Sequence, residues 1–249
     1  MKKLFILLFI AATFSVAGYS QTYHYDVNGD GVVTVADVTA IYNYLLGNLP
    51  VEPTDDKEYV DLGLPSGTLW ATVNIGANSM EDYGDYFAWG ETAPKYVYNW
   101  SSYKWCNGSE RSLTKYCTSS SYGTVDNMTE LDLDDDAAYV NWGPEWRMPS
   151  QEQIQELMDN CTTYWTTING VNGRLFTSNI NGVSLFLPAA GYRYEGTQAG
   201  VGSRGDYWSR NLRISIQPYA LYISSSSVGM EYGIRDHGFT VRAVRASQK

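Results

Sequence analysis

Histidine and cysteine are scarce in this 249-residue chain, which has two histidines and three cysteines. His24 and His237 lie far apart in sequence, and no cysteine pair has the spacing of zinc ligands. A Ser-His-Asp site would have to recruit His237, but the sequence has no G-x-S-x-G turn. Neither a zinc centre nor a serine hydrolase site is therefore expected.

Positive charge is also in short supply. The chain has 17 Lys and Arg against 27 Asp and Glu, a net charge of −10. An acidic chain repels phosphate backbones, so nucleic acid is not an expected partner. Aromatic residues are abundant instead, with 21 Tyr and 8 Trp. They indicate a β-rich core, or a surface that stacks against sugars.

Long apolar runs are absent except at the start of the chain. Lys2 and Lys3 precede an apolar stretch over residues 4–17, and small residues follow it. This pattern predicts a signal peptide over residues 1–20, cut between Ser20 and Gln21. The run is shorter than the roughly 20 residues of a membrane span, and no later segment resembles a span. No cysteine lies near the cut, so we expect a secreted or cell-surface protein that is not a lipoprotein.

The three cysteines leave one thiol over after any pairing. Cys106 and Cys117 bracket the short segment CNGSERSLTKYC, which a disulfide could close in an oxidising compartment. The alternative is two buried thiols. Both interpretations stay open on the sequence alone.

The segment DVNGDGVVTVAD, residues 26–37, has the spacing of an EF-hand-like calcium loop. Asp26, Asn28 and Asp30 would supply side-chain oxygens, Val32 its backbone carbonyl, and Asp37 the closing carboxylate. Apolar residues then recur at helical spacing until Gly47, where a helix would end. The sequence therefore predicts a Ca²⁺ site followed by a short helix.

Loop and helix together, residues 22–49, resemble one repeat of a type I dockerin. The resemblance implies calcium binding and a possible cohesin-like partner in a polysaccharide-degrading complex. Two departures stand against docking of the familiar kind. The second repeat is absent, and Val35 and Ala36 occupy positions that help to select the cohesin, often as Ser-Thr.

Residues 50–57 are proline-containing and acidic, which is typical of a linker, and a larger domain is expected over residues 58–246. Short alternating runs rich in β-formers predict many strands, and Asn-Gly pairs beginning at Asn169, Asn172 and Asn181 predict hairpin turns. SQEQIQELMDNC predicts a helix capped by Ser150 and Gln153. We expect an α+β fold.

This domain also resembles a known family. Its motifs are EYVDLGLPSGTLWATVNIGA, GDYFAWGETAPK, WRMPSQEQIQEL, FLPAAGYRYEGT, GDYWSRN and GFTVRAVRA. Together they look like the Fibrobacter succinogenes major paralogous domain of secreted Bacteroidetes proteins. The resemblance implies a C-type-lectin-like fold related to formylglycine-generating enzymes, with a mostly uncharacterised function. The oxidase activity is not expected, because no cysteine follows Cys161. Val73 stands where the family often has a cysteine, so a family disulfide through this position is not expected.

Three further motifs have simple interpretations. GVGSRG, residues 200–205, fits a dinucleotide fingerprint, but a strand-like run follows it where a helix is needed. Arg204-Gly205-Asp206 is an integrin-type tripeptide, which is weak evidence by itself. LDLDDDAA, with Asp132, Asp134, Asp135 and Asp136, indicates an acidic helix start rather than a second calcium site.

The sequence favours a non-enzymatic binding protein that recognises a glycan or a protein. The predicted ligand contacts are Tyr192, Tyr194, Arg204 and Tyr207, while Trp208 has a core position as its alternative. One other hypothesis is an accessory or catalytic component of polysaccharide degradation, attached through the dockerin-like repeat. Another is a structural subunit of a surface assembly.

Overall fold

The computed structural model describes residues 57–246, which are called the β domain below. The chain divides into two compact units, Met1–Asp56 and Lys57–Lys249, and the boundary falls inside the predicted linker. None of the helices within residues 57–246 is long and apolar enough to cross a bilayer.

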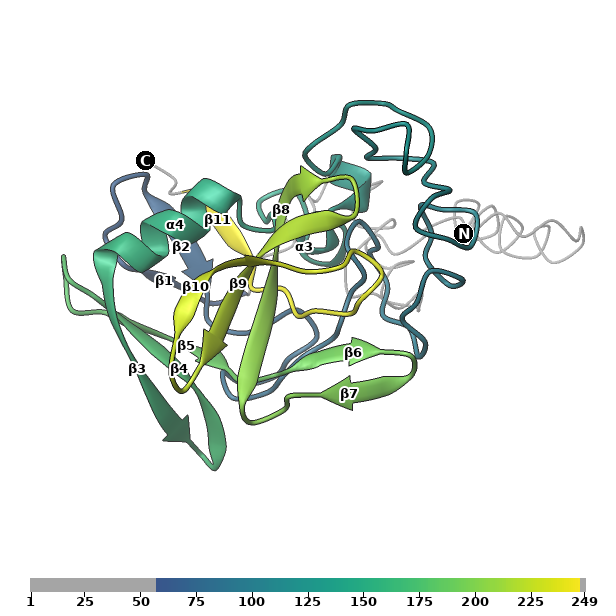
Figure 1. Cartoon of the computed structure of the whole chain (residues 1–249). Helices are drawn as coiled ribbons and strands as arrows, with labels where there is room; N and C mark the ends of the chain where they lie inside the picture. Colours follow the sequence, from purple (N-terminus) through teal and green to yellow (C-terminus); the bar gives the residue numbers. More distant parts are fainter. Residues whose placement is uncertain (1–56, 247–249) are drawn as a thin grey trace, which may run out of the picture. The chain divides into compact units, whose positions relative to one another are not determined.

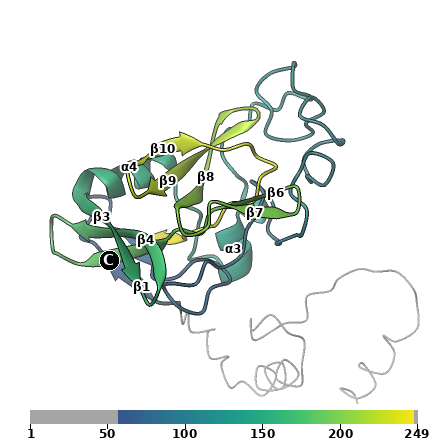
Figure 2. The ribbon, with the colours of Figure 1, turned by 60° about the horizontal axis from the view of Figure 1, so that its bottom comes forward.

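The β domain is built from small antiparallel sheets (Figures 1 and 2). Three sheets have three strands each, in the orders β1-β2-β11, β10-β9-β8 and β3-β4-β5, and β6 pairs with β7. Because β2 lies between β1 and β11, the first and last strands of the domain share one sheet. The strands are β1 (Tyr59–Asp61), β2 (Thr68–Ala71), β3 (Cys161–Ile168), β4 (Val171–Ser178), β5 (Ser184–Pro188), β6 (Tyr192–Tyr194), β7 (Thr197–Ala199), β8 (Arg204–Ile214), β9 (Gln217–Ser224), β10 (Val228–Tyr232) and β11 (Val244–Ala246).

The helical content is low, and the α+β class predicted from the sequence is wrong. Strands account for 37% of the described residues and helices for 10%. The helices are the 3-10 turn η1 (Leu133–Asp135), α3 (Ala137–Trp142) and α4 (Gln151–Asn160). α3 ends after six residues at Gly143, whose φ of 94° no helix continues. The domain is therefore mainly β, and the predicted helical N-terminal element lies outside the described residues.

Local signals for α4 and for two hairpin turns are confirmed. The Ser150 side chain accepts a hydrogen bond from the Gln153 backbone. The Gln153 side chain accepts one from the Ser150 backbone, which completes a capping box. Asn169 and Gly170 form the two-residue turn between β3 and β4, both with positive φ. Gly182 lies with positive φ between β4 and β5.

The third Asn-Gly pair is not a turn. Asn172 and Gly173 lie inside β4, opposite Thr167 and Thr166 of β3. A Cβ on Gly173 would come within 2.4 Å of the Leu187 carbonyl oxygen and 2.5 Å of the Phe186 ring. The glycine is therefore required by the close approach of β5 rather than by backbone reversal.

Much of the aromatic content lies in the core. Trp70, Trp89, Trp146 and Trp208 are all fully buried. The Trp208 indole stacks on Phe239 with ring centroids 3.9 Å apart and donates a hydrogen bond to the Phe87 carbonyl. The core alternative for Trp208 is thus confirmed.

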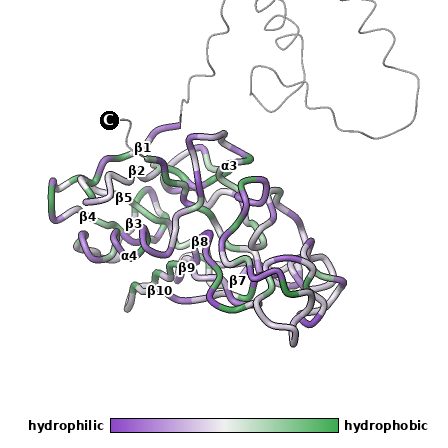
Figure 3. Tube along the Cα trace, turned by 90° about the horizontal axis from the view of Figure 1, so that it is seen from above, coloured by the Kyte–Doolittle hydropathy of each residue, from purple (hydrophilic) through white to green (hydrophobic). Residues whose placement is uncertain are grey.

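Residues 72–132, called the loop region below, contain no helix or strand. Hydrophobic and hydrophilic residues interleave along these loops as well as along the strands (Figure 3). Two buried arginines connect the loop region to the sheets. Arg235 donates to the carbonyls of Tyr116 and Ser215, and Arg242 donates to Asn74 and to the Phe186 carbonyl.

Candidate functional site

The predicted calcium ligands Asp26, Asn28, Asp30, Val32 and Asp37 lie outside the described residues. Their coordination therefore stays a prediction. Within residues 57–246, no group of three or more His, Cys, Asp and Glu side chains could hold a metal ion. The geometry that follows belongs to the β domain alone.

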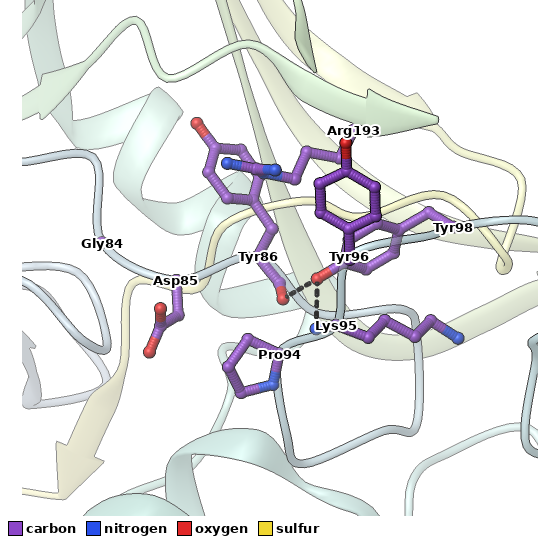
Figure 4. Close-up of a pocket in the computed structure, with 8 residues that line it drawn as sticks. All are labelled: Gly84, Asp85, Tyr86, Pro94, Lys95, Tyr96, Tyr98 and Arg193. Atoms are coloured by element: carbon purple, nitrogen blue, oxygen red, sulfur yellow. Dashed lines mark hydrogen bonds between the residues drawn. The ribbon is translucent and has the colours of Figure 1, made fainter. Parts of the chain in front are cut away.

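A shallow pocket of about 420 Å³ lies between the loop region and β6 (Figure 4). Its lining comes from two loop segments and from one residue of β6. The lining residues are Gly84, Asp85, Tyr86, Pro94, Lys95, Tyr96, Tyr98 and Arg193. The pocket thus combines aromatic rings with one carboxylate and two cationic side chains.

Two buried tyrosines form the frame of this pocket. The Tyr98 hydroxyl donates to the Tyr86 carbonyl and accepts from the Lys95 backbone at 3.1 Å (Figure 4). The Tyr86 hydroxyl donates to the Ala190 carbonyl at 2.5 Å. Burial raises the pKa of Tyr86 to about 12 and also raises the pKa of Tyr98. Both phenols are therefore neutral at physiological pH and serve to hold the loops together.

Arg193 presents an unpaired guanidinium to the pocket. Its backbone exchanges hydrogen bonds with Gly238 at 2.8 and 2.9 Å, which fixes β6 in place. The guanidinium lies over the Tyr86 ring, 4.9 Å from its centroid (Figure 4). It makes no hydrogen bond or ion pair with any residue of the described part of the chain. Its donors are therefore available to a ligand.

The rim of the pocket is exposed and aromatic. Tyr96 is 76% exposed, and the edge of its ring packs on Gly196, in the turn between β6 and β7. That turn is attached to the loop region, because the Glu195 backbone donates to the Tyr98 carbonyl and Asn99 donates to the Glu195 carboxylate. The two walls are thus joined directly at the rim.

The predicted ligand contacts have four different environments. Tyr194 is 42% exposed, and Tyr192 is half-buried beside Phe239. Tyr207 is only 2% exposed, and its hydroxyl donates to the Pro188 carbonyl, so this ring supports the core. Arg204 is held by Asp206 and lies 4.9 Å from the Tyr192 ring centroid. Ligand binding by Tyr192, Tyr194 and Arg204 stays a prediction.

The Arg-Gly-Asp tripeptide has its two charges turned toward each other. The Arg204 guanidinium donates to the Asp206 carboxylate, at 2.8 Å from Nε, and Asp206 is buried. An integrin-type contact needs an exposed carboxylate, which is not available here.

Gly200 and Gly202 form a turn with positive φ, and β8 rather than a helix follows them, so the dinucleotide interpretation fails as expected.

Asp236 and His237 lie on the turn that leads to Phe239. The Asp236 side chain is fully buried, and neither of its oxygens has a hydrogen-bond partner among the described residues. Burial raises the pKa of Asp236 to about 6. Burial, aided by the charge of Arg204, lowers the pKa of His237 to about 4. His237 is therefore neutral at pH 7 and packs 4.6 Å from the Tyr194 ring.

The acidic cluster acts as a structural element, as the sequence predicts. Asp136 caps α3 by accepting from the backbones of Ala138 and Tyr139. Asp135 accepts from Lys115 at 2.7 Å and from the Tyr116 hydroxyl at 2.6 Å. Burial opposes ionisation of Asp135, but these hydrogen bonds outweigh it and hold its pKa below the usual value. The oxygens are thus already used within the protein.

The three cysteines are free thiols in the structure. The thiol of Cys106 donates to the Trp100 carbonyl, and that of Cys117 to the Ser119 carbonyl, each at 3.1 Å. In the structure Cys106 and Cys117 are therefore two separate thiols and not a disulfide. Burial raises the pKa of Cys161 to about 11, which keeps this thiol protonated and unreactive.

Sequence reasoning placed ligand contacts on the segment around β6 and missed Tyr86, Tyr96 and Arg193. The wall that contains Tyr86 and Tyr96 is distant from β6 in sequence and meets it through hydrogen bonds such as that from Glu195 to Tyr98. Alternation in the YRYEG segment indicates that Arg193 faces away from Tyr192 and Tyr194, a signal that could have been used.

Comparison with known proteins matches one segment of the chain to a family. No curated protein and no solved structure matches the chain, so the resemblance of residues 58–246 to the Fibrobacter succinogenes major paralogous domain stays a prediction. Residues 24–62 match the Dockerin type I domain, a calcium-binding module that mediates cohesin binding and assembly. This match runs past the predicted limits of the dockerin-like repeat, residues 22–49. Its last residues, 57–62, include β1, which pairs with β2 in the β domain.

Proposed function

We propose that the N-terminal segment is a calcium-dependent docking module that attaches the β domain to a cohesin-type partner outside the cell. The observation behind the proposal is the dockerin match at residues 24–62, which contains the whole predicted calcium loop. The assembly would belong to a polysaccharide-degrading system, the setting that the dockerin match implies.

Calcium would order the docking surface. The side chains of Asp26, Asn28 and Asp30 and the carbonyl of Val32 supply the hard oxygen ligands that Ca²⁺ prefers. Asp37 closes the loop with a carboxylate one methylene shorter than the usual glutamate. A single extracellular loop of this kind binds with a Kd on the order of 10⁻⁴ to 10⁻³ M. Docking would therefore respond to millimolar calcium.

We also propose that the β domain acts by binding and not by catalysis. The pocket beside Arg193 supports binding, because its aromatic walls are held by hydrogen bonds and its guanidinium has no partner among the described residues.

The test is calcium-dependent docking of the full chain, without residues 1–20, to a panel of purified type I cohesins. Binding is measured by calorimetry in 5 mM CaCl₂, roughly ten times the expected Kd for calcium, and again in EGTA. We expect binding to one or more cohesins in calcium, and none in EGTA or in the Asp26→Ala/Asp30→Ala variant.

Asp134→Ala is the control, because it removes an exposed carboxylate from the β domain. It should bind as the parent protein does. Docking that persists in EGTA, or no docking to any cohesin although the segment binds calcium, would contradict the proposal.

A further inference from the structure

The pocket beside Arg193 contains an unpaired cation and an unpaired anion. The guanidinium has five N–H donors, and none of them bonds to a described residue. Asp85 is half-buried, and no described residue donates a hydrogen bond to its carboxylate. In Figure 4 the Asp85 carboxylate points away from Arg193, so the two groups do not neutralise each other.

The orientation of Arg193 favours an anion. Its guanidinium carbon lies over the Tyr86 ring, and a guanidinium with free N–H groups can donate two parallel hydrogen bonds to a carboxylate or sulfate. Lys95, the other cation of the lining, is already paired with Glu91 at 2.8 Å. Arg193 is therefore the group that would bind the anion.

The rest of the pocket favours a sugar ring. Tyr96 offers an exposed aromatic face at the rim, on which the C–H face of a pyranose can pack. The pocket is shallow and hydrogen-bonded at both walls, so a ligand would meet a site that needs little reorganisation.

We propose that this pocket binds an acidic saccharide, with its carboxylate or sulfate on Arg193 and a ring face on Tyr96. The inference rests on the proposal that the β domain acts by binding, and it names the ligand class. The pocket is distinct from the ligand contacts predicted from the sequence, none of which lines it.

The test uses the full chain without residues 1–20 and two acidic probes, trigalacturonate and a sulfated trisaccharide. The methyl ester of trigalacturonate is the uncharged probe of the same shape. We expect at least one acidic probe to bind, and trigalacturonate, where it binds, to bind about tenfold or more tighter than its ester, the size of a hydrogen bond to a charged group.

Matched variants assign binding to the pocket. Arg193→Ala should weaken binding by about tenfold or more, and Tyr96→Ala by about threefold to tenfold. Arg213→Ala and Tyr164→Ala remove an exposed arginine and an exposed tyrosine on β8 and β3, and should leave affinity unchanged. Unfolding midpoints confirm that each variant is folded.

Several results would overturn the proposal. These are absence of binding by both acidic probes, equal binding of the acid and its ester, or an Arg193→Ala variant that binds as the parent does. Equal affinity for a short peptide with a free carboxylate would reject the saccharide class. Cohesin docking is measured on the same samples, so its failure can be told apart from failure of the pocket.

Discussion

The sheets and the loop region of the β domain are stabilised in different ways. The sheet side has antiparallel ladders and an apolar cluster that includes Trp70, Ile154, Leu157 and Phe176. The loop region has no strand, and buried polar side chains add to its apolar packing. Arg235 alone bonds to the Tyr103 hydroxyl and to three backbone carbonyls.

The difference shows what replaces a backbone ladder. Buried carbonyls need donors, and in loops without regular pairing side chains can supply those that backbone N–H groups do not. Arg235 and the Tyr98 hydroxyl do this for the loop region, and the same loops form one wall of the pocket. The proposed ligand site therefore depends on polar contacts as well as on the apolar packing of Tyr86 and Tyr98.

The largest expected effect is on the sheet side. Phe176 is fully buried on β4, so Phe176→Ala should lower the free energy of unfolding by about 3–5 kcal/mol through a cavity. Fluorescence and circular dichroism in urea should report one coincident transition. Tyr164→Ala on the exposed face of β3 is the control and should change stability little. A loss below about 1 kcal/mol would mean that this core is not close-packed.

A somewhat smaller and more local effect is expected in the loop region. Arg235→Met should cost about 2–4 kcal/mol, because it leaves the carbonyls of Tyr116 and Ser215 without their donor. Limited proteolysis should then cut within residues 72–132 before the sheets unfold. Arg213→Met removes an exposed arginine and should not change the cleavage pattern. Equal cleavage in both variants would show that Arg235 does not fasten the loops.

The contribution of the buried Asp236 carboxyl to the free energy of unfolding should depend on pH. Its folded-state pKa of about 6 lies above the ordinary 3.8, so the folded state favours the protonated carboxyl. Stability from this group is complete below about pH 4 and falls as the pH rises through 6. Lys95, Glu195 and Glu110 are the charged groups that act on it, and the lysine opposes the shift.

Asp236→Asn removes this titration while keeping the shape of the side chain. The variant should be about 3 kcal/mol more stable than the parent at pH 7.5 and equal to it near pH 4. The difference between the two proteins is the quantity to measure, because the lowered pKa of His237 changes stability with pH in the opposite direction. A parent protein that gains stability relative to the variant with rising pH would contradict this assignment.

The features that sequence predicts well are local. Ser150 and Gln153 are three residues apart and cap α4, and Asn169-Gly170 closes a two-residue hairpin. The acidic cluster at Asp132–Asp136 also behaves as a helix start. In each case the physical cause lies within a few residues, where spacing is informative.

What sequence reasoning missed depends on distant contacts. Gly173 resembles a turn residue but is required by the approach of Phe186 and Leu187. Arg235 and Tyr103 pair across the domain without any periodic signal. The predicted α+β class was wrong because one well-marked helix does not show how little of the remaining chain is helical. The candidate pocket was not predicted, because none of the four predicted ligand contacts lines it and Arg193, the β6 residue that does, was not among them.

The smallest expected effect tests whether the sheets and the loop region unfold separately, because the substitution removes a single hydrogen bond from the sheet side. Ser150→Ala removes the cap of α4, which packs against β8, β9 and β10, and should cost about 1 kcal/mol in urea unfolding. Ser150→Asp retains an acceptor for the Gln153 backbone and should recover most of the loss. Ser225→Ala, in the exposed turn between β9 and β10, should have no effect. The loop region should resist protease equally in all three variants, because α4 is attached to the sheets. Enhanced cleavage of residues 72–132 in Ser150→Ala would show instead that the two regions unfold as one unit.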